Sequence, residues 1–163
     1  MSSFRIGQGF DVHEFGGDGP LALCGLELPD ETGLAGHSDA DVALHAVCDA
    51  LFGAVAAGDI GEHFPGSDDR WLGADSAVFI RRALAEVREA GCRVANCDLT
   101  IIGERPRIVR HREAMRRRLA ELLETEVPRV SVKATTTDGL GCIGRGEGLA
   151  AMAVVLIEEV EDE

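Results

Sequence analysis

Residues 4–13, FRIGQGFDVH, alternate between two kinds of side chain, and this alternation constrains the fold more than any other feature of the sequence. A repeat of two residues predicts a half-buried β-strand, because successive side chains of a strand point to opposite faces of the sheet. The apolar side chains expected to face the core are Phe4, Ile6, Phe10 and Val12. The opposite face carries Asp11 and His13 beside two glycines, and we expect it to be open.

A hairpin and a helix are predicted next along the chain. Residues 21–28, LALCGLEL, have the composition of a return strand, and the glycines and proline of residues 16–20 supply a turn. Ser38 is typical of a helix N-cap, and apolar residues at helical spacing follow it as far as Val55. Residues 58–73 have the composition of a mobile loop.

The second half of the chain predicts further helices and strands without a repeat or a linker. The predicted elements are a helix over 74–90 that stops at Gly91, a strand over 94–103, a helix over 107–124 and strands over 129–137 and 149–159. This order predicts an α+β fold: a single domain over residues 1–163 with a mixed β-sheet packed on one face by helices.

Composition excludes some classes of partner. The formal net charge of −13 argues against nucleic acid, because a phosphate backbone requires a basic surface. No segment approaches the roughly 20 apolar residues of a membrane span, and the first ten residues lack the apolar run of a signal peptide, so we expect a cytoplasmic protein. The five cysteines form no C-x-x-C pair and are interpreted as reduced thiols, mostly in the core.

Three residues predict a catalytic zinc site. Asp11 and His13 lie on one face of the first strand, and His45 lies on the first helix, one turn from Asp41 and from Asp49, either of which could hold its second ring nitrogen. Three ligands with an open fourth position are typical of catalytic zinc. The alternatives are an exposed polar strand end and a hydrogen-bonded core histidine.

Two other segments suit a phosphorylated ligand. His37 precedes the predicted N-cap Ser38, where the free N–H groups of a helix would favour an anion. The strand over 129–137 runs through Thr135, Thr136 and Thr137 to Asp138 and a glycine-rich turn, which is similar to a phosphate and magnesium cradle. Threonines in strands and glycines in turns are the alternative explanation.

Five ordered blocks, GFDVHEF, AGHSDADVALHAVCDALFGA, GDIGEHFP, KATTTD and GRGEG, resemble the 2-C-methyl-D-erythritol 2,4-cyclodiphosphate synthase family over essentially the whole chain. The resemblance implies conversion of 4-diphosphocytidyl-2-C-methyl-D-erythritol 2-phosphate, a cytidine diphosphate substrate, into the cyclic diphosphate and CMP in the non-mevalonate isoprenoid pathway. It also implies a homotrimer with its sheets toward the threefold axis and its active sites between adjacent subunits.

The resemblance also implies roles for individual residues. Asp11, His13 and His45 correspond to the zinc ligands, one ion per subunit. Asp138 corresponds to the carboxylate that contacts a second metal, Mg²⁺ or Mn²⁺, bound with the substrate diphosphate. His37 and Thr136 correspond to catalytic residues that stabilise the transition state.

The positions implied to contact the substrate form four groups. Asp11, Val12, His13, His37 and Ser38 surround the zinc ion, and Asp59, Ile60, Gly61, Phe64, Pro65, Gly66, Ser67 and Asp68 border the methylerythritol arm. Gly103, Glu104, Arg105, Pro106, Arg107, Ile108 and Val109 read the cytidine, contributed by the other subunit. Thr135, Thr136, Thr137, Asp138, Cys142 and Arg145 lie near the phosphates and the central cavity of the trimer.

Four of these positions depart from the usual family pattern. Asp138 replaces a usual glutamate and is one methylene shorter, so a water-mediated metal contact is an alternative there. Cys142 replaces a frequent aromatic residue near the central cavity of the trimer, which argues against binding of an isoprenoid diphosphate there. Gly66 replaces a commonly acidic residue, and Arg107 replaces a common lysine.

Two other functions are compatible with the same residues. A zinc phosphohydrolase would hold an activated water at the open position and release inorganic phosphate or a linear product. A non-catalytic protein would bind a nucleotide or an isoprenoid diphosphate without releasing CMP. A purely structural metal site should instead have four protein ligands, and only three are apparent in the sequence.

Overall fold

The computed structural model describes residues 3–160. Its strands are β1 (Phe4–Leu23), β2 (Leu26–Leu34), β3 (Cys92–Ile102), β4 (Val130–Thr135) and β5 (Gly148–Glu159). Its α-helices are α1 (Val42–Ala54), α2 (Ile60–His63), α3 (Ala77–Glu89), α4 (Arg112–Leu122) and α5 (Gly141–Gly144), and its 3₁₀ helices are η1 (Asp69–Trp71), η2 (Ile108–Arg110) and η3 (Val127–Arg129).

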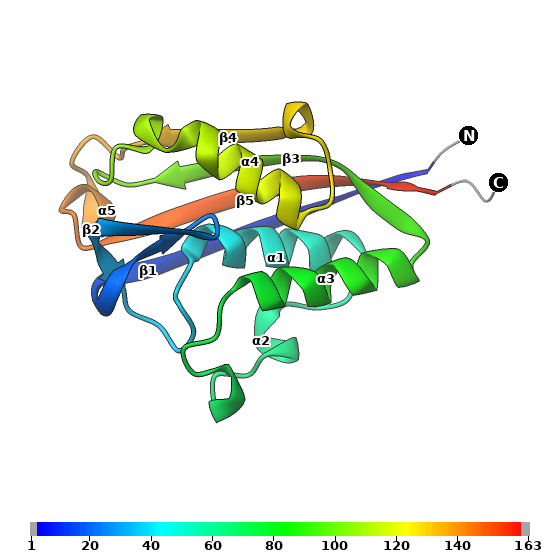
Figure 1. Ribbon diagram of the computed structural model, residues 1–163, viewed down its shortest axis with the longest axis horizontal. Helices are drawn as coiled ribbons and strands as arrows, with labels where there is room; N and C mark the ends of the chain where they lie inside the picture. The colour runs from blue at the N-terminus through cyan, green and yellow to red at the C-terminus, as the bar shows by residue number, and fades with distance from the viewer. Residues whose placement is uncertain (1–2, 161–163) are drawn as a thin grey trace.

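The strands form one mixed sheet in the order β2-β1-β5-β3-β4, in which β3 and β4 are parallel and the other neighbours antiparallel. Helix α1 packs on β1 and β5, α3 lies beside α1, and α4 packs against β4 (Figure 1). The buried side chains of α1, α3 and α4 share one core cluster with those of the strands. The predicted α+β fold, with helices on one face of a mixed sheet, is therefore confirmed.

Strand β1 forms where it was predicted, but its two faces are the reverse of the prediction. Gly7 and Gly9 face α1 so closely that an added Cβ would lie 1.7 Å from the carbonyl oxygen of Ala50 and 1.8 Å from that of Ala46, respectively. The apolar side chains Phe4, Ile6, Phe10 and Val12 are instead 48–68% exposed. The glycines admit a helix backbone directly onto the sheet, so the face expected to be open is the covered one.

The hairpin turn also lies elsewhere than predicted. Strand β1 continues through residues 16–20 with register shifts between Phe15 and Leu21, and two of its glycines, Gly16 and Gly19, have positive φ. Bulges of this kind absorb glycine and proline without ending a strand. The chain reverses at Cys24 and Gly25, so residues 21–28 supply the end of β1 and the start of β2.

Helix α1 begins three residues later than its predicted cap would place it. Its N-cap is Asp41, whose carboxylate accepts hydrogen bonds from the N–H groups of Leu44 at 3.0 Å, Cys24 at 3.0 Å and Gly25 at 2.7 Å. Burial raises the pKa of Asp41 to about 6. Ser38 is not the cap, and one buried carboxylate thus fixes the start of α1 to the turn between β1 and β2.

The loop predicted over residues 58–73 contains two short helices. Asp59 caps α2, Asp68 caps η1, and Asp49 of α1 accepts a hydrogen bond from the Ile60 N–H at 2.8 Å. Composition alone does not reveal these caps, because acidic residues are also common in loops. The later strands and α3 lie close to their predicted bounds, whereas α4 begins at Arg112 because η2 occupies the first turn.

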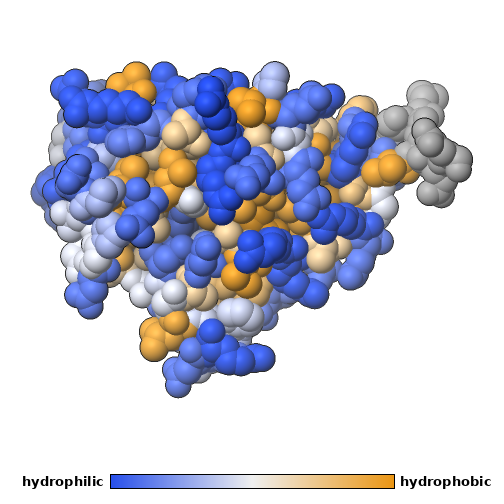
Figure 2. Space-filling model, in the orientation of Figure 1, coloured by the Kyte–Doolittle hydropathy of each residue, from blue (hydrophilic) through white to orange (hydrophobic). Residues whose placement is uncertain are grey.

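Four of the five cysteines are buried, Cys142 is exposed, and all five are free, which confirms the reduced thiols. Burial raises the pKa of Cys97 to about 12. Within residues 3–160, no helix is long and apolar enough to cross a membrane. Hydrophilic side chains cover most of the face shown in Figure 2, as expected for a net charge of −13.

The close contact between α1 and β1 gives a stability prediction. Gly9→Ala should lower the free energy of unfolding by about 2–3 kcal/mol, because its Cβ would overlap backbone atoms of α1 at a strand position that is paired with β5. Chemical denaturation monitored by circular dichroism measures the change. Gly66→Ala is the control, because no atom lies within 4 Å of its added Cβ. Equal stabilities of the two variants would contradict the prediction.

Candidate metal centre and nucleotide pocket

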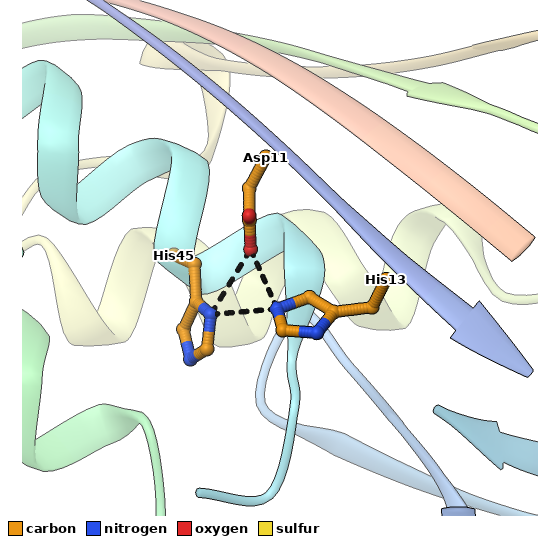
Figure 3. Close-up of side chains that lie close together, drawn as sticks. All are labelled: Asp11, His13 and His45. Atoms are coloured by element: carbon orange, nitrogen blue, oxygen red, sulfur yellow. Dashed lines mark hydrogen bonds and ion pairs between the residues drawn. The ribbon is translucent and has the colours of Figure 1, made fainter. Parts of the chain in front are cut away.

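Three side chains from two elements converge on one point. Asp11 and His13 project from β1 and His45 projects from α1 (Figure 3). The Asp11 Oδ2 atom lies 2.8 Å from His13 Nε2 and 3.0 Å from His45 Nδ1, and the two ring nitrogens are 3.2 Å apart. The prediction that these residues come together is confirmed.

The packing of α1 on the glycine face of β1 also brings the three residues together. Asp11 and His13 share the strand face of Gly7 and Gly9, which lies against α1, and His45 is in the first turn of that helix. The side chains keep only 12–27% of their surface exposed. A site in this position is shielded from bulk water yet reachable from one side.

Hydrogen bonds determine which nitrogen of each ring faces the centre. His13 Nδ1 lies 2.8 Å from the Ala35 carbonyl oxygen, which can only accept, so Nδ1–H donates and Nε2 faces Asp11. His45 Nε2 lies near the hydroxyls of Ser38 and Ser76 at 3.1 and 3.0 Å. The prediction that Asp41 or Asp49 holds this nitrogen is therefore wrong. The carboxylates of these two residues instead accept hydrogen bonds from backbone N–H groups.

The electrostatics of the three residues suit a cation. Burial acts to raise the pKa of Asp11, but hydrogen bonds from His13 and His45 outweigh it and hold the pKa well below its ordinary value. The hydrogen bond to Asp11 raises the pKa of His13. Two imidazole nitrogens and one carboxylate oxygen are ordinary ligands of a divalent transition metal, so the donor set fits a metal ion.

A cavity of about 150 Å³ adjoins the three residues. Its lining residues are His13, His37, Ser38, His45, Ile60, Phe64, Gly66, Trp71 and Phe79. The Phe64 ring packs 4.4 Å from Phe79 and edge-on to Trp71 at 4.9 Å, so one wall is apolar. Sequence reasoning missed Trp71 and Phe79, since an isolated aromatic residue carries no signal that distinguishes a cavity wall from a core.

The position of His37 differs from its predicted setting. It lies in the segment before α1, and because Asp41 is the cap, His37 does not flank the first turn of the helix. Its Nε2 donates to the Asp68 carbonyl oxygen at 3.0 Å, a contact that joins two segments of the cavity rim. His37 and Ser38 still line the cavity beside His45.

A second pocket of about 340 Å³ lies where the parallel strands β3 and β4 end. Its lining residues are Ile101, residues 103–109, Arg112, Ala134, Thr135, Thr136 and Leu149. The Gly103 N–H donates to the Thr135 carbonyl oxygen at 2.9 Å and joins the two strand ends. Arg112 was missed because it begins a helix rather than belonging to a recognisable motif.

The predicted residues therefore divide between two places in one subunit. Within the described residues, the metal cavity and the second pocket share no lining residue. The predicted residues that line neither are Asp11, Val12, Asp59, Gly61, Pro65, Ser67, Asp68, Thr137, Asp138, Cys142 and Arg145. The Asp138 N–H donates to Thr136 Oγ1 at 3.2 Å, which keeps this carboxylate close to the threonine of the second pocket.

Sequence comparisons identify relatives along nearly the whole chain. The model of the YgbB family matches residues 4–158. The 2-C-methyl-D-erythritol 2,4-cyclodiphosphate synthase of Shewanella amazonensis is 55% identical over 157 residues, covering 96% of this chain and 98% of that protein. The synthase of Bacillus cereus strain B4264 is 54% identical over 156 residues, covering 96% and 99%.

Solved structures share the fold. IspF from Plasmodium falciparum, in a complex with CDP, matches with a TM-score of 0.85 and 28% identity over 98% of each chain. A CDP-bound 2C-methyl-D-erythritol-2,4-cyclodiphosphate synthase matches with a TM-score of 0.85 and 38% identity over 94% of this chain and 99% of that chain. The bifunctional IspDF of Campylobacter jejuni reaches 0.94 at 38% identity, and this chain spans 44% of its length.

The family match and the curated relatives extend over the strands, the helices and the three converging side chains alike. The resemblance found in the sequence motifs therefore holds for the chain as a whole. This chain belongs to the YgbB family.

Proposed function

We propose that this protein is the cyclodiphosphate synthase of the non-mevalonate isoprenoid pathway, a phosphorus–oxygen lyase. It converts 4-diphosphocytidyl-2-C-methyl-D-erythritol 2-phosphate into 2-C-methyl-D-erythritol 2,4-cyclodiphosphate and CMP. The observation that carries the proposal is the convergence of Asp11, His13 and His45 in a chain whose curated relatives bear that name. The domain comprises residues 1–163, of which residues 1–2 and 161–163 lie outside the described part.

The metal of the three-residue site is zinc, one ion per subunit. The ligand atoms are 2.8–3.2 Å apart, and tetrahedral zinc with bonds of about 2.0–2.1 Å requires about 3.3 Å. When bound, zinc supplies a Lewis acid for a phosphate oxygen. Asp11 and His13 would hold it from the strand and His45 from the helix.

The substrate reacts with itself. An oxygen of its 2-phosphate forms a bond to the β-phosphorus, and the bond from that phosphorus to the oxygen bridging the α-phosphorus breaks, so CMP leaves with the electron pair. No protein nucleophile is needed, and positioning with charge neutralisation supplies the catalysis. His37, oriented by the Asp68 carbonyl, and the Thr136 hydroxyl are the catalytic residues that stabilise the phosphorane-like transition state.

A second divalent cation, Mg²⁺ or Mn²⁺, accompanies the substrate diphosphate. Asp138 is its protein ligand, directly or through water, because the carboxylate is exposed and sits beside Thr136. Oxygen ligands are those that Mg²⁺ prefers. Arg145 forms an ion pair with Glu147 at 2.6 Å and lies in the exposed segment that follows α5.

The substrate spans two regions. Residues 59–61 and 64–68 hold the methylerythritol arm beside the metal cavity, and residues 103–109 with Thr135 and Thr136 hold the cytidine diphosphate in the second pocket. The two cavities share no lining residue in the described chain, which supports a shared site in which the pocket of one subunit completes the metal cavity of its neighbour. Val12, Thr137 and Cys142 lie at the margins of this shared site.

A homotrimer supplies that neighbour. Large apolar side chains remain exposed on the sheet face opposite the helices, and they are Phe4, Ile6, Phe10, Val12, Met152 and Val154. Such a cluster on one face is typical of a protein interface. The sheets of three subunits pack through this face toward a threefold axis, with the helices outside.

The remaining predictions concern cellular context. Cytoplasmic localisation, the absence of a nucleic-acid partner and the absence of a membrane partner rest on the sequence and its charge of −13. The cytidine diphosphate substrate is then the principal partner, and the two CDP complexes of related proteins support this class of ligand.

The function is tested by phosphorus NMR of the purified protein with its substrate, zinc and magnesium, beside a chelator-treated sample. We expect cyclic diphosphate and CMP in equal amounts, and only with metal. Inorganic phosphate or a linear product would identify a phosphohydrolase instead. Persistent substrate signals with stoichiometric binding would identify a binding protein.

The metal site predicts a loss of zinc without a loss of fold. Asp11→Asn should reduce zinc affinity by at least about 100-fold and abolish turnover, because the amide oxygen carries no charge. Zinc content after dialysis and near-ultraviolet circular dichroism measure the two properties. Asp18→Asn, a change farther along the same strand, is the control and should retain zinc. Unfolding of the Asp11 variant alone would make the site structural.

A further inference from the structure

Two hydroxyls lie behind the imidazole of His45, on the side away from Asp11. His45 Nε2 is 3.0 Å from Ser76 Oγ and 3.1 Å from Ser38 Oγ. Ser76 is fully buried. Its hydroxyl also contacts Asp39 Oδ1, and its N–H donates to Asp39 Oδ2 at 2.9 Å. Neither Asp39 nor Ser76 has a part in the chemistry proposed above.

The direction of these hydrogen bonds follows from counting hydrogens. The ionised carboxylate of Asp39 can only accept, so the single hydroxyl hydrogen of Ser76 points to Asp39. The Ser76 oxygen can then only accept from His45, which requires a hydrogen on Nε2. When a metal replaces the Nδ1 hydrogen bond to Asp11, the lone pair of His45 is then on Nδ1, the atom that faces Asp11 and His13.

Asp39 is held firmly enough to impose this direction. Its carboxylate accepts hydrogen bonds from the Ser76 hydroxyl, from the Ser76 N–H and from the Asp41 N–H at 3.1 Å. Its own N–H donates to the Ala74 carbonyl oxygen at 3.0 Å. The carboxylate is thus fixed both to the segment before α1 and to the start of α3.

A purely structural role explains Ser76 less well. Serine at the beginning of a helix normally caps it through its hydroxyl, yet the Ser76 side chain makes no cap bond to α3. Asp75 accepts the hydrogen bond of the Ala77 N–H at 2.8 Å instead. The Ser76 hydroxyl is left to connect Asp39 to His45.

We propose that Asp39 and Ser76 are positioning residues that present His45 Nδ1 to the metal. They act through hydrogen bonds and touch neither metal nor substrate. The Ala35 carbonyl has the corresponding role for His13, so each histidine ligand has a defined acceptor behind it. The inference rests on the proposed metal site but not on which reaction the site catalyses.

The test compares Ser76→Ala and Asp39→Asn with Asp75→Asn in the full-length protein. Zinc affinity is measured by competition with a chromophoric chelator, without substrate. We expect the first two variants to bind zinc about 10–100-fold more weakly, as is typical when the partner of a ligand histidine is removed. Asp75→Asn, which alters a neighbouring carboxylate without contact to His45, should keep wild-type affinity within about 3-fold.

A second measurement separates positioning from general damage. Nitrogen-15 NMR of the zinc-loaded protein reports the hydrogen on His45 Nε2 and its exchange with water. We expect a slowly exchanging Nε2–H in the wild type and in Asp75→Asn, and faster exchange in Ser76→Ala and Asp39→Asn. In Asp39→Asn the new amide can donate to Ser76, whose oxygen is then no longer fixed as an acceptor for Nε2–H. Thermal unfolding identifies any variant that loses its fold. If Ser76→Ala or Asp39→Asn unfolds, the remaining folded variant tests the positioning role.

Unchanged zinc affinity and an unchanged Nε2–H signal in either folded variant would overturn the proposal. Its failure is distinct from failure of the proposed function, because no substrate is used. If the wild type released no CMP but Ser76→Ala still lost zinc affinity, the positioning role would stand and the reaction would be wrong. If CMP were released normally and both variants bound zinc like the wild type, the proposed reaction would stand and the positioning role would be wrong.

Discussion

Helix α1 rests on strand β1 at backbone distance, and the rest of the structure depends on this contact. Gly7 and Gly9 lack the side chains that would separate the two elements, so the carbonyl oxygens of Ala46 and Ala50 occupy the space of a Cβ. Because Asp11 and His13 lie farther along the same strand face, the first turn of α1 brings His45 within hydrogen-bonding distance of Asp11. The packing that forms the core thereby also forms the metal site.

The same contact determines which side chains are exposed on the other face of the sheet. With α1 on the glycine face, the apolar residues of β1 and β5 on the opposite face stay outside the core cluster of their own subunit, and they are Phe4, Ile6, Phe10, Val12, Met152 and Val154. A second layer of protein is the ordinary way to cover such a face. The proposed trimer uses this face for its contacts between subunits.

The sequence predicted which residues form the metal site but not how the chain places them. The D-x-H spacing of Asp11 and His13 fixed a common strand face, and helical periodicity placed His45 near the start of a helix. Polarity assigned the wrong face to the core, because the usual rule assumes that apolar residues are covered within one chain. The partners of His45, Ser38 and Ser76, come from separate segments, and only tertiary packing reveals them.

The proposed trimer makes each active site from the metal half of one subunit and the nucleotide half of its neighbour. It is tested most directly by mixing two inactive variants, Asp11→Asn and Thr136→Ala, through co-refolding and measuring CMP release. In a randomly mixed cyclic trimer, about one site in four combines an intact metal half with an intact neighbouring pocket, so we expect recovery of about a quarter of wild-type activity. If mixed trimers form but remain inactive, each site lies within a single subunit and the proposed division between subunits is wrong.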